Sequence, residues 1–296
     1  KDATEKIARG TGVRGLINIQ FAYVSENLYV IEANPRASRT VPFVSKATGV
    51  QMAKAAVLIG LGKSIAELKA EGYLPSNMDG ASLPEETAIA VKAAVLPFAR
   101  FRTPEGVVVD SLLSPEMRST GEVMGLDKHY DTAFAKAQAG AGSPLPTSGK
   151  VFISVANHDK RNVIIYAKML ESLGFEIVST GGTAEILRRN GLNSVIVASK
   201  FAEANGDHSI VDMVRNGDID LILNTPAGGA ARSDGYEIRA AAVSVGCPVM
   251  TTISEFAAAV QAINALREHS WDIMSLQEHG VQLAAAVDAR SEGGEA

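Results

Sequence analysis

"VFISVANHDKRNVIIYAKMLESLGFEIVSTGGT", residues 151–183, decides the fold, because it predicts a strand, a helix and a second strand in close succession. Residues 151–156 are a short apolar run of the kind that forms a buried strand. Residues 159–174 repeat apolar side chains at helical spacing and end on a glycine, which is a common helix stop. The strand-like run 175–180 comes next, and a double-glycine turn at 180–183 opens another helix. The segment is therefore typical of one unit in an alternating α/β pattern.

The same alternation continues toward the C-terminus and predicts further strands and helices. The strands are expected at 194–199, 218–225 and 247–252, and the helices at 209–217, 236–246 and 254–268. Five βα units with short connections predict a doubly wound parallel sheet. The stretch before them, 139–150, concentrates Gly, Pro and Ser and is the strongest linker signal in the chain. We therefore expect an α/β domain at residues 144–296.

Near the N-terminus, residues 15–24 and 28–35 alternate around a short connection and predict a β-hairpin. A turn centred on Glu26 would create four cross-strand pairs: Val24 with Leu28, Ala22 with Val30, Gln20 with Glu32, and Asn18 with Asn34. These pairs would share one face of the sheet, because side chains alternate with a period of two. A slip of one residue in the register would reverse the faces.

Helical and irregular segments fill the rest of the chain before the α/β domain. Helix-like runs are found at 42–49 and 50–62. Beyond residue 71 the pattern is less regular, with a strand-like run at 89–98, an expected loop at 102–125 and a short alanine-rich helix near 131–139. We interpret residues 72–143 as the remainder of the first half of the chain and a spacer.

Composition excludes several classes of protein. The chain has 296 residues, of which 28 are basic and 33 acidic, so its formal net charge of −5 predicts no nucleic-acid binding. No apolar run approaches the roughly 18 residues of a membrane span, and the charged start "KDATEKIARG" lacks the pattern of a signal peptide. The single cysteine, Cys247, excludes an intramolecular disulfide and favours a cytoplasmic protein. A first residue other than Met indicates a piece of a longer chain.

A first candidate site lies in "VIEANPRASRT", residues 30–40, and in the strand before it. Gln20, Glu32 and Asn34 would offer three oxygens on one sheet face, which suits a hard divalent cation such as Mg²⁺. Two arginines follow at once, and guanidinium groups bind phosphate through paired hydrogen bonds. The alternative, from these residues alone, is a solvated strand end that binds nothing.

A second candidate site lies at the expected carboxyl ends of two parallel strands. "TGGT" (180–183) and "NTPAGG" (224–229) each join a strand to a helix, and the free amide groups of a helix start suit phosphate. Lys160 and Lys200 would add positive charge. The alternative is that the glycines only make tight turns between strand and helix.

Several long strings carry a family resemblance. "NIQFAY", "LYVIEANPRASRTVPFVSKATG", "LPF" and "LLSPEMRSTGEVMG" resemble the end of the second ATP-grasp unit of the carbamoyl-phosphate synthase family. Residues 144–296 resemble the methylglyoxal-synthase-like domain of the same family. By this resemblance, residues 1–71 are the end of the ATP-grasp domain and 72–143 are the remainder of the synthetic half with a spacer. The resemblance covers essentially the whole chain and implies an ATP-dependent ligase of pyrimidine and arginine biosynthesis.

For the first site, the resemblance implies a set of ligands and a reaction. Gln20 and Glu32 would bind ATP, and Gln20, Glu32 and Asn34 would hold Mg²⁺ or Mn²⁺, with K⁺ as a further cation. Arg36 would act in catalysis beside the phosphates, where carbamate is phosphorylated to carbamoyl phosphate. The remaining nucleotide-binding residues are expected upstream of Lys1, so the fragment alone is expected to be inactive.

In the second domain, the resemblance implies a regulatory site for a nucleotide monophosphate, UMP or IMP. The residues at the matching positions are Lys160, Thr180, Thr183, Lys200 and Asn224. This sequence departs from the family pattern at Pro226, where some members have a threonine, so one hydroxyl donor is absent.

Some members also bind ornithine, at positions that match Leu96, Leu113 and Thr251. Here Ala93 stands where the family pattern has a glutamate. A cationic ligand would lose a charge-assisted hydrogen bond worth about 1.5–3 kcal/mol. The substitution therefore speaks against ornithine binding.

The methylglyoxal-synthase-like family also includes a phosphate-eliminating lyase, which has an acidic residue straight after its Gly-Gly turn. This chain has Ala230 there, and alanine cannot abstract a proton; a substitute role for His158 and Asp159 is a minor alternative. We therefore expect a binding domain without the lyase reaction, and the alternative for the whole chain is an isolated regulatory module. The expected partners are a small glutaminase subunit, a nucleotide effector and further copies of the chain.

Overall fold

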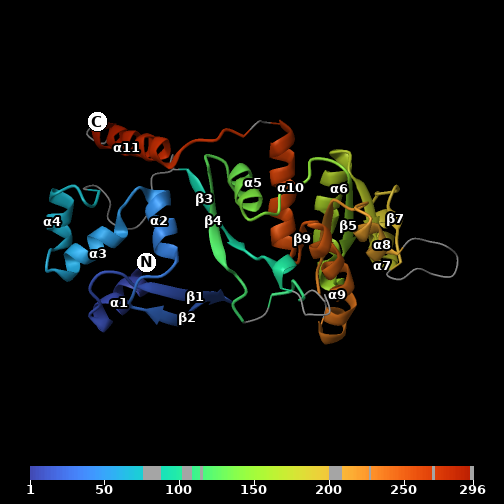
Figure 1. Cartoon of the computed structure of the whole chain (residues 1–296), viewed down its shortest axis with the longest axis horizontal. Coiled ribbons are helices and arrows are strands. Elements are labelled where there is room, and N and C mark those ends of the chain that lie inside the picture. The colour runs from blue at the N-terminus through green and yellow to red at the C-terminus, as the bar shows by residue number, and fades with distance from the viewer. Residues whose placement is uncertain are drawn as a thin grey trace. The chain divides into compact units, whose positions relative to one another are not determined.

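The computed structural model forms two compact units, shown in Figure 1. One unit comprises Lys1–Ala88 with Ile273–Ala296, and the other comprises Ile89–Asp272. The structure describes residues 1–75, 88–101, 109–113, 116–199, 209–226, 228–268 and 271–293, and only the backbone of 228–234, 284 and 286–293. The division into sequence domains at 71/72 and 143/144 stays a prediction.

The second unit contains the predicted doubly wound sheet. Its five parallel strands are β5 (Lys150–Ser154), β6 (Glu176–Ser179), β7 (Ile196–Val197), β8 (Leu221–Asn224) and β9 (Val249–Met250), in the spatial order β7-β6-β5-β8-β9. Its helices are α6 (Lys160–Ser172), α7 (Gly181–Arg189), α8 (Ile210–Arg215), α9 (Gly228–Val245) and α10 (Ile253–Glu268), with the short 3-10 helices η1 (Phe98–Arg100) and η2 (Asn157–Asp159). The α/β prediction is confirmed.

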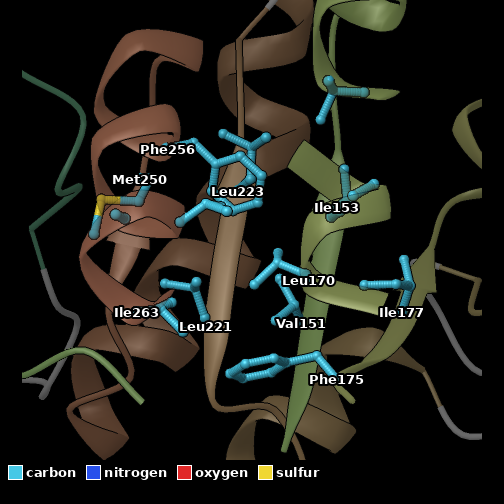
Figure 2. Close-up of a cluster of buried hydrophobic side chains, with 14 of the residues drawn as sticks. Val151, Ile153, Leu170, Phe175, Ile177, Leu221, Leu223, Met250, Phe256 and Ile263 are labelled. Carbon is cyan, nitrogen blue, oxygen red and sulfur yellow. The ribbon is translucent and has the colours of Figure 1, made fainter. Parts of the chain in front are cut away.

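The sheet is buried on both faces, because successive side chains of β5 enter two different hydrophobic clusters. Val151 and Ile153 pack with side chains of α6, α7 and α10, as Figure 2 shows for part of this cluster. Phe152, between them, packs with side chains of α8 and α9. None of the three side chains is exposed. The apolar run that predicted a buried strand therefore serves both faces, as parallel sheets require.

The same unit begins with an antiparallel pair of strands, β3 (Ile89–Val95) and β4 (Gly121–Asp127), followed by α5 (Tyr130–Gly140). The loop predicted at 102–125 is wrong at its end, because residues 121–125 pair with β3. Lys136 Nζ lies 2.7 Å from Asp127 Oδ2 and connects α5 to β4. Burial alone would raise the pKa of Asp127, but hydrogen bonds from Lys136 and from the N–H of His129 outweigh burial and lower this pKa.

The first unit consists of one hairpin and helices. The hairpin strands are β1 (Asn18–Val24) and β2 (Asn27–Asn34), and the helices are α1 (Asp2–Thr11), α2 (Thr40–Thr48), α3 (Met52–Gly60), α4 (Ile65–Ala70) and α11 (Leu276–Gly293). The helix-like runs at 42–49 and 50–62 are confirmed as α2 and α3, whereas α1, α4 and α11 were not predicted. None of the described helices combines the length and apolarity needed to cross a membrane.

Gly125 sets the distance between β4 and α5, so we predict that Gly125→Ala destabilises the second unit. A Cβ atom on Gly125 would overlap the carbonyl oxygen of Ala133 and lie 2.6 Å from the backbone nitrogen of Ala137. Backbone atoms of a helix cannot move aside as a flexible side chain can. We expect the free energy of unfolding, measured by urea titration, to fall by about 3 kcal/mol.

Gly121→Ala is the matched control in the same strand. A Cβ atom there would lie 3.8 Å from its nearest neighbour, the Val95 side chain, and alanine restricts the unfolded chain more than glycine does. We expect no loss of stability. Equal stabilities of the two variants would contradict the close packing of α5 on β4.

The only cysteine gives a second prediction. Burial, with the Asp220 carboxylate adding to it, raises the pKa of the Cys247 thiol to about 12. Because the thiolate is the reactive form, about one molecule in 10,000 is reactive at pH 8. Iodoacetamide should therefore label the native protein at pH 8 at least about 100-fold more slowly than the urea-unfolded protein. Similar rates in the two states would show that the thiol is not shielded.

Candidate functional site

The β1–β2 hairpin brings Gln20 opposite Glu32 and Asn18 opposite Asn34, as predicted. Near the turn the register differs from the prediction, because Val24 pairs with Asn27 and Ala22 pairs with Tyr29. The predicted pairs of Val24 with Leu28 and of Ala22 with Val30 are wrong.

The turn and a bulge explain why the register is wrong at one end and right at the other. Ser25 and Glu26 form a two-residue turn with φ angles of 49° and 64°, the left-handed conformation of tight hairpin turns. A turn of this length shifts the pairing by one residue. Ile31 has no partner in the ladder, and this bulge shifts the pairing back. Glu32 therefore faces Gln20 because of the bulge.

The polar groups of the hairpin end are held locally. Asn34 Nδ2 donates to Glu32 Oε1 at 2.9 Å, so one carboxylate oxygen accepts a hydrogen bond and the other remains available as a ligand. The N–H of Arg36 donates to the carbonyl of Asn34 at 2.9 Å, and Arg36 Nη1 donates to the carbonyl of Ala37 at 3.1 Å. Gln20, Glu32 and Arg36 are exposed, and Asn34 is half-buried.

This donor set fits a hard divalent cation that is also bound by phosphate oxygens. One carboxylate and two amide oxygens are available, and Mg²⁺ in nucleotide sites commonly takes one or two carboxylates together with substrate phosphates. Among the residues that the structure describes, no group of three His, Cys, Asp or Glu side chains could hold a metal ion by itself. The hairpin therefore offers part of a coordination shell.

In the second unit, the candidate phosphate site lies at the carboxyl ends of β5, β6 and β8. Thr180 precedes α7, and its carbonyl accepts hydrogen bonds from the N–H groups of Thr183 and Ala184 at 3.0 and 2.8 Å. The first N–H groups of a helix have no partner inside it, so those of Gly181 and Gly182 point away from the helix. Both glycines are exposed. The start of α7 can therefore donate hydrogen bonds to an anion.

Lys160 places a positive charge at the same point. Its Nζ lies 3.3 Å from the position that a Cβ atom would occupy on Gly182. No ion pair of Lys160 is found in the part of the chain that the structure describes, and its neighbour Asp159 faces His158 at 3.4 Å. A helix N-terminus carries a partial positive charge. Two positive features thus meet at the start of α7.

Hydroxyl groups connect the three strand ends. Ser154 Oγ lies 3.3 Å from Thr180 Oγ1, and Thr183 Oγ1 accepts from the N–H of Val155 at 3.5 Å. Thr225 Oγ1, after β8, accepts from the N–H of Ala156 at 2.9 Å. The strand order reverses direction between β5 and β8, where Ser154 pairs with Asn224. Open α/β sheets bind ligands at such a reversal.

Asn224 belongs to a polar network that the sequence did not reveal. Its Oδ1 accepts from Arg239 Nη1 at 2.9 Å, and Arg239 also binds both carboxylate oxygens of Asp110. The available sequence signal was the position of Arg239 in the largely apolar helical run 236–246, because an arginine that is buried in such a run has to find a partner.

The structure describes only some of the remaining predicted residues. Lys200 lies outside the described residues, and the side chain of Ala230 does too. Leu96 and Thr251 are half-buried, whereas Leu113 is 56% exposed. These three come from separate segments of the second unit, and the ornithine-type site stays a prediction.

Two family models match this chain, one in each half of the sequence. Residues 1–68 match the family model described as the ATP binding domain of the carbamoyl-phosphate synthase L chain. Residues 162–251 match the model of the MGS-like domain. The first match contains the hairpin, and the second contains most of the strand ends around Thr180 and Asn224.

Curated relatives extend the similarity to almost the whole chain. The carbamoyl phosphate synthase large chain of Kocuria rhizophila is 70% identical over 281 residues, which are 94% of this chain and 25% of that protein. Large chains from Micrococcus luteus and Streptomyces coelicolor are 65% and 56% identical over 96% and 97% of this chain, and 26% of each relative is covered. The chain therefore spans about a quarter of the length of the relatives that it matches.

Proposed function

We propose that this chain is the C-terminal portion of a carbamoyl phosphate synthase large chain. Nearly the whole chain is similar in sequence to such large chains, and it corresponds to about a quarter of their length. It would contribute metal and ATP ligands to the phosphorylation of carbamate and carry a nucleotide-binding regulatory domain. Two observations support this proposal: the pairing of Glu32 with Gln20 at the hairpin end, and the position of the Lys160 ammonium at the start of α7.

In the proposed reaction, Gln20, Glu32 and Asn34 would hold Mg²⁺ or Mn²⁺ together with ATP. The metal would neutralise phosphate charge as the terminal phosphoryl group is transferred to carbamate. Glu32 provides the carboxylate from β2, and Gln20 provides an amide oxygen from the opposite strand. Arg36, one residue beyond Pro35, would bind phosphate oxygens through its guanidinium group and stabilise the charge that develops there.

In the proposed regulatory site, the N–H groups at the start of α7 and the ammonium of Lys160 would bind the phosphate of UMP or IMP. Thr180, Thr183 and Asn224 line the same strand ends. This unit could bind effector without the catalytic half, so an isolated regulatory module is the second candidate function for the chain on its own.

The wider setting is also part of the proposal. A small glutaminase subunit would supply ammonia to the full-length protein, and further copies of the chain would form a homo-oligomer. The single cysteine suits a cytoplasmic enzyme, where carbamoyl phosphate would enter pyrimidine and arginine biosynthesis. K⁺ would be a further cation of the catalytic site.

Replacing Glu32 tests the catalytic part of the proposal. In a full-length large chain that carries this segment, Glu32→Gln removes the only carboxylate of the ligand set without changing its size. We expect carbamoyl phosphate synthesis to fall below about a tenth of the wild-type rate, while UMP binding is unchanged. Glu26→Gln, in the exposed turn of the same hairpin, is the control and should retain full activity. Activity of Glu32→Gln above that level would remove Glu32 from the metal site.

Replacing Lys160 tests the regulatory part. Lys160→Met keeps the length of the side chain but removes its charge, so we expect UMP to bind the chain about 10- to 100-fold more weakly in isothermal titration calorimetry. Lys168→Met is the control, because Lys168 is exposed two turns later on α6. Equal UMP affinities of wild type and Lys160→Met would place the phosphate elsewhere.

A further inference from the structure

Among the side chains that the structure describes in the second unit, the largest fully buried one is that of Arg239, on α9. Its Nε and Nη2 donate to the two carboxylate oxygens of Asp110 at 2.7 and 2.8 Å, and its Nη1 donates to Asn224 Oδ1 at 2.9 Å. A buried guanidinium group is stable only when its charge and its donors are matched in this way. The three residues, called here the Arg239 network, therefore act as one unit.

The network fixes which polar atom Asn224 presents to a ligand. Arginine can only donate hydrogen bonds, so Arg239 requires the acceptor Oδ1 of Asn224 on its own side. The donor Nδ2 is then the atom left for other partners. A strand end that presents a donor at Asn224 favours ligands rich in acceptors, such as phosphate oxygens and base carbonyls.

Close packing keeps the guanidinium group in place. A Cβ atom on Gly235, one turn before Arg239, would overlap Arg239 Nη1 and lie 2.5 Å from Asn224 Oδ1. Only glycine leaves room for both groups at this position. A shift of Asn224 toward α9 would therefore press on Arg239 Nη1, which lies 2.9 Å from Asn224 Oδ1.

On its other side, the network holds residues 109–113. Asp110 Oδ1 accepts from the N–H of Leu112 at 3.0 Å in addition to Arg239 Nε. Among the residues that the structure describes, the adjacent Ser111 has a buried hydroxyl oxygen without a hydrogen-bond partner. Leaving such a group without a partner is unfavourable, so a rearrangement that satisfies Ser111 would offset part of the cost of moving this segment.

We propose that the Arg239 network couples effector binding at the strand ends to the conformation of residues 109–113. Binding of a nucleotide monophosphate at Asn224 would shift Arg239, and Asp110 would carry this shift into the segment. Arg239 is then a positioning residue, because it acts through Asn224 and Asp110 and does not touch the ligand. This inference rests on the nucleotide site proposed above.

Hydrogen–deuterium exchange of the 296-residue chain, with and without UMP, tests the coupling directly. We expect UMP to change exchange both in peptides that contain 180–184 and in peptides that contain 109–113. A change at 180–184 alone would overturn the coupling and leave the nucleotide site intact. No change in either region would overturn the nucleotide site itself, so the two failures are distinguishable.

Variants of the network separate coupling from general destabilisation. Asp110→Asn removes the charge partner of Arg239; we expect UMP still to protect 180–184, to lose its effect at 109–113, and to bind about fivefold more weakly. The control Glu122→Gln removes the carboxylate that pairs with Lys92 on β4 and β3 at 3.5 Å and should leave both effects unchanged. A UMP effect at 109–113 that survives in Asp110→Asn would overturn the proposal.

Arg239→Lys provides a second variant if circular dichroism shows that Asp110→Asn does not fold. Lysine retains the buried charge, but it cannot bind both oxygens of Asp110 and Asn224 Oδ1 together in a planar fork. We expect UMP to protect 180–184 and to lose its effect at 109–113 in this variant as well. Retention of that effect would show that the guanidinium geometry does not transmit it.

Discussion

Burial of both faces of β5 is the constraint on which the second unit depends. Val151, Phe152 and Ile153 have no exposed surface, and β6 and β8 pair with β5 in parallel. Parallel neighbours require crossover connections, and the helices of these crossovers cover both faces of the sheet. Polar side chains can therefore gather only at the strand ends, beginning with Ser154. The candidate effector site therefore lies at the carboxyl ends of the strands because both faces of the sheet are buried.

Two cationic side chains near these strand ends, Arg239 and Lys160, have different surroundings. Arg239 is fully buried, the Asp110 carboxylate pairs with its charge, and Asp110 and Asn224 together accept three of its hydrogen bonds. Lys160 is half-buried beside the start of α7, where the helix dipole is also positive. The first cation is paired within the protein and has a structural role. The second lacks an ion pair within the described part of the chain, which makes it the candidate for binding an anion.

In the β1–β2 hairpin, the predicted pairing at the candidate metal site is correct because two deviations from the prediction cancel. The pairing of Gln20 with Glu32 followed from assuming a turn centred on Glu26, but the turn is one residue shorter and a bulge at Ile31 restores the register. Ser25 and Glu26 adopt positive φ angles although neither residue type favours them. Local sequence preference therefore could not predict the turn, whose conformation matches the twist of the paired strands β1 and β2.

The sequence by itself determined the α/β class, the five-stranded parallel sheet and the family resemblance, because hydrophobic periodicity and long sequence strings are local properties. It also identified Lys160 and Thr180 as candidates for one site. Only the tertiary structure decided that Lys160 lies against Gly182 and that Arg239 binds Asp110, 129 residues away in the chain. Contacts of this kind depend on how strands are ordered and how helices pack, and periodicity within a segment carries no information about either.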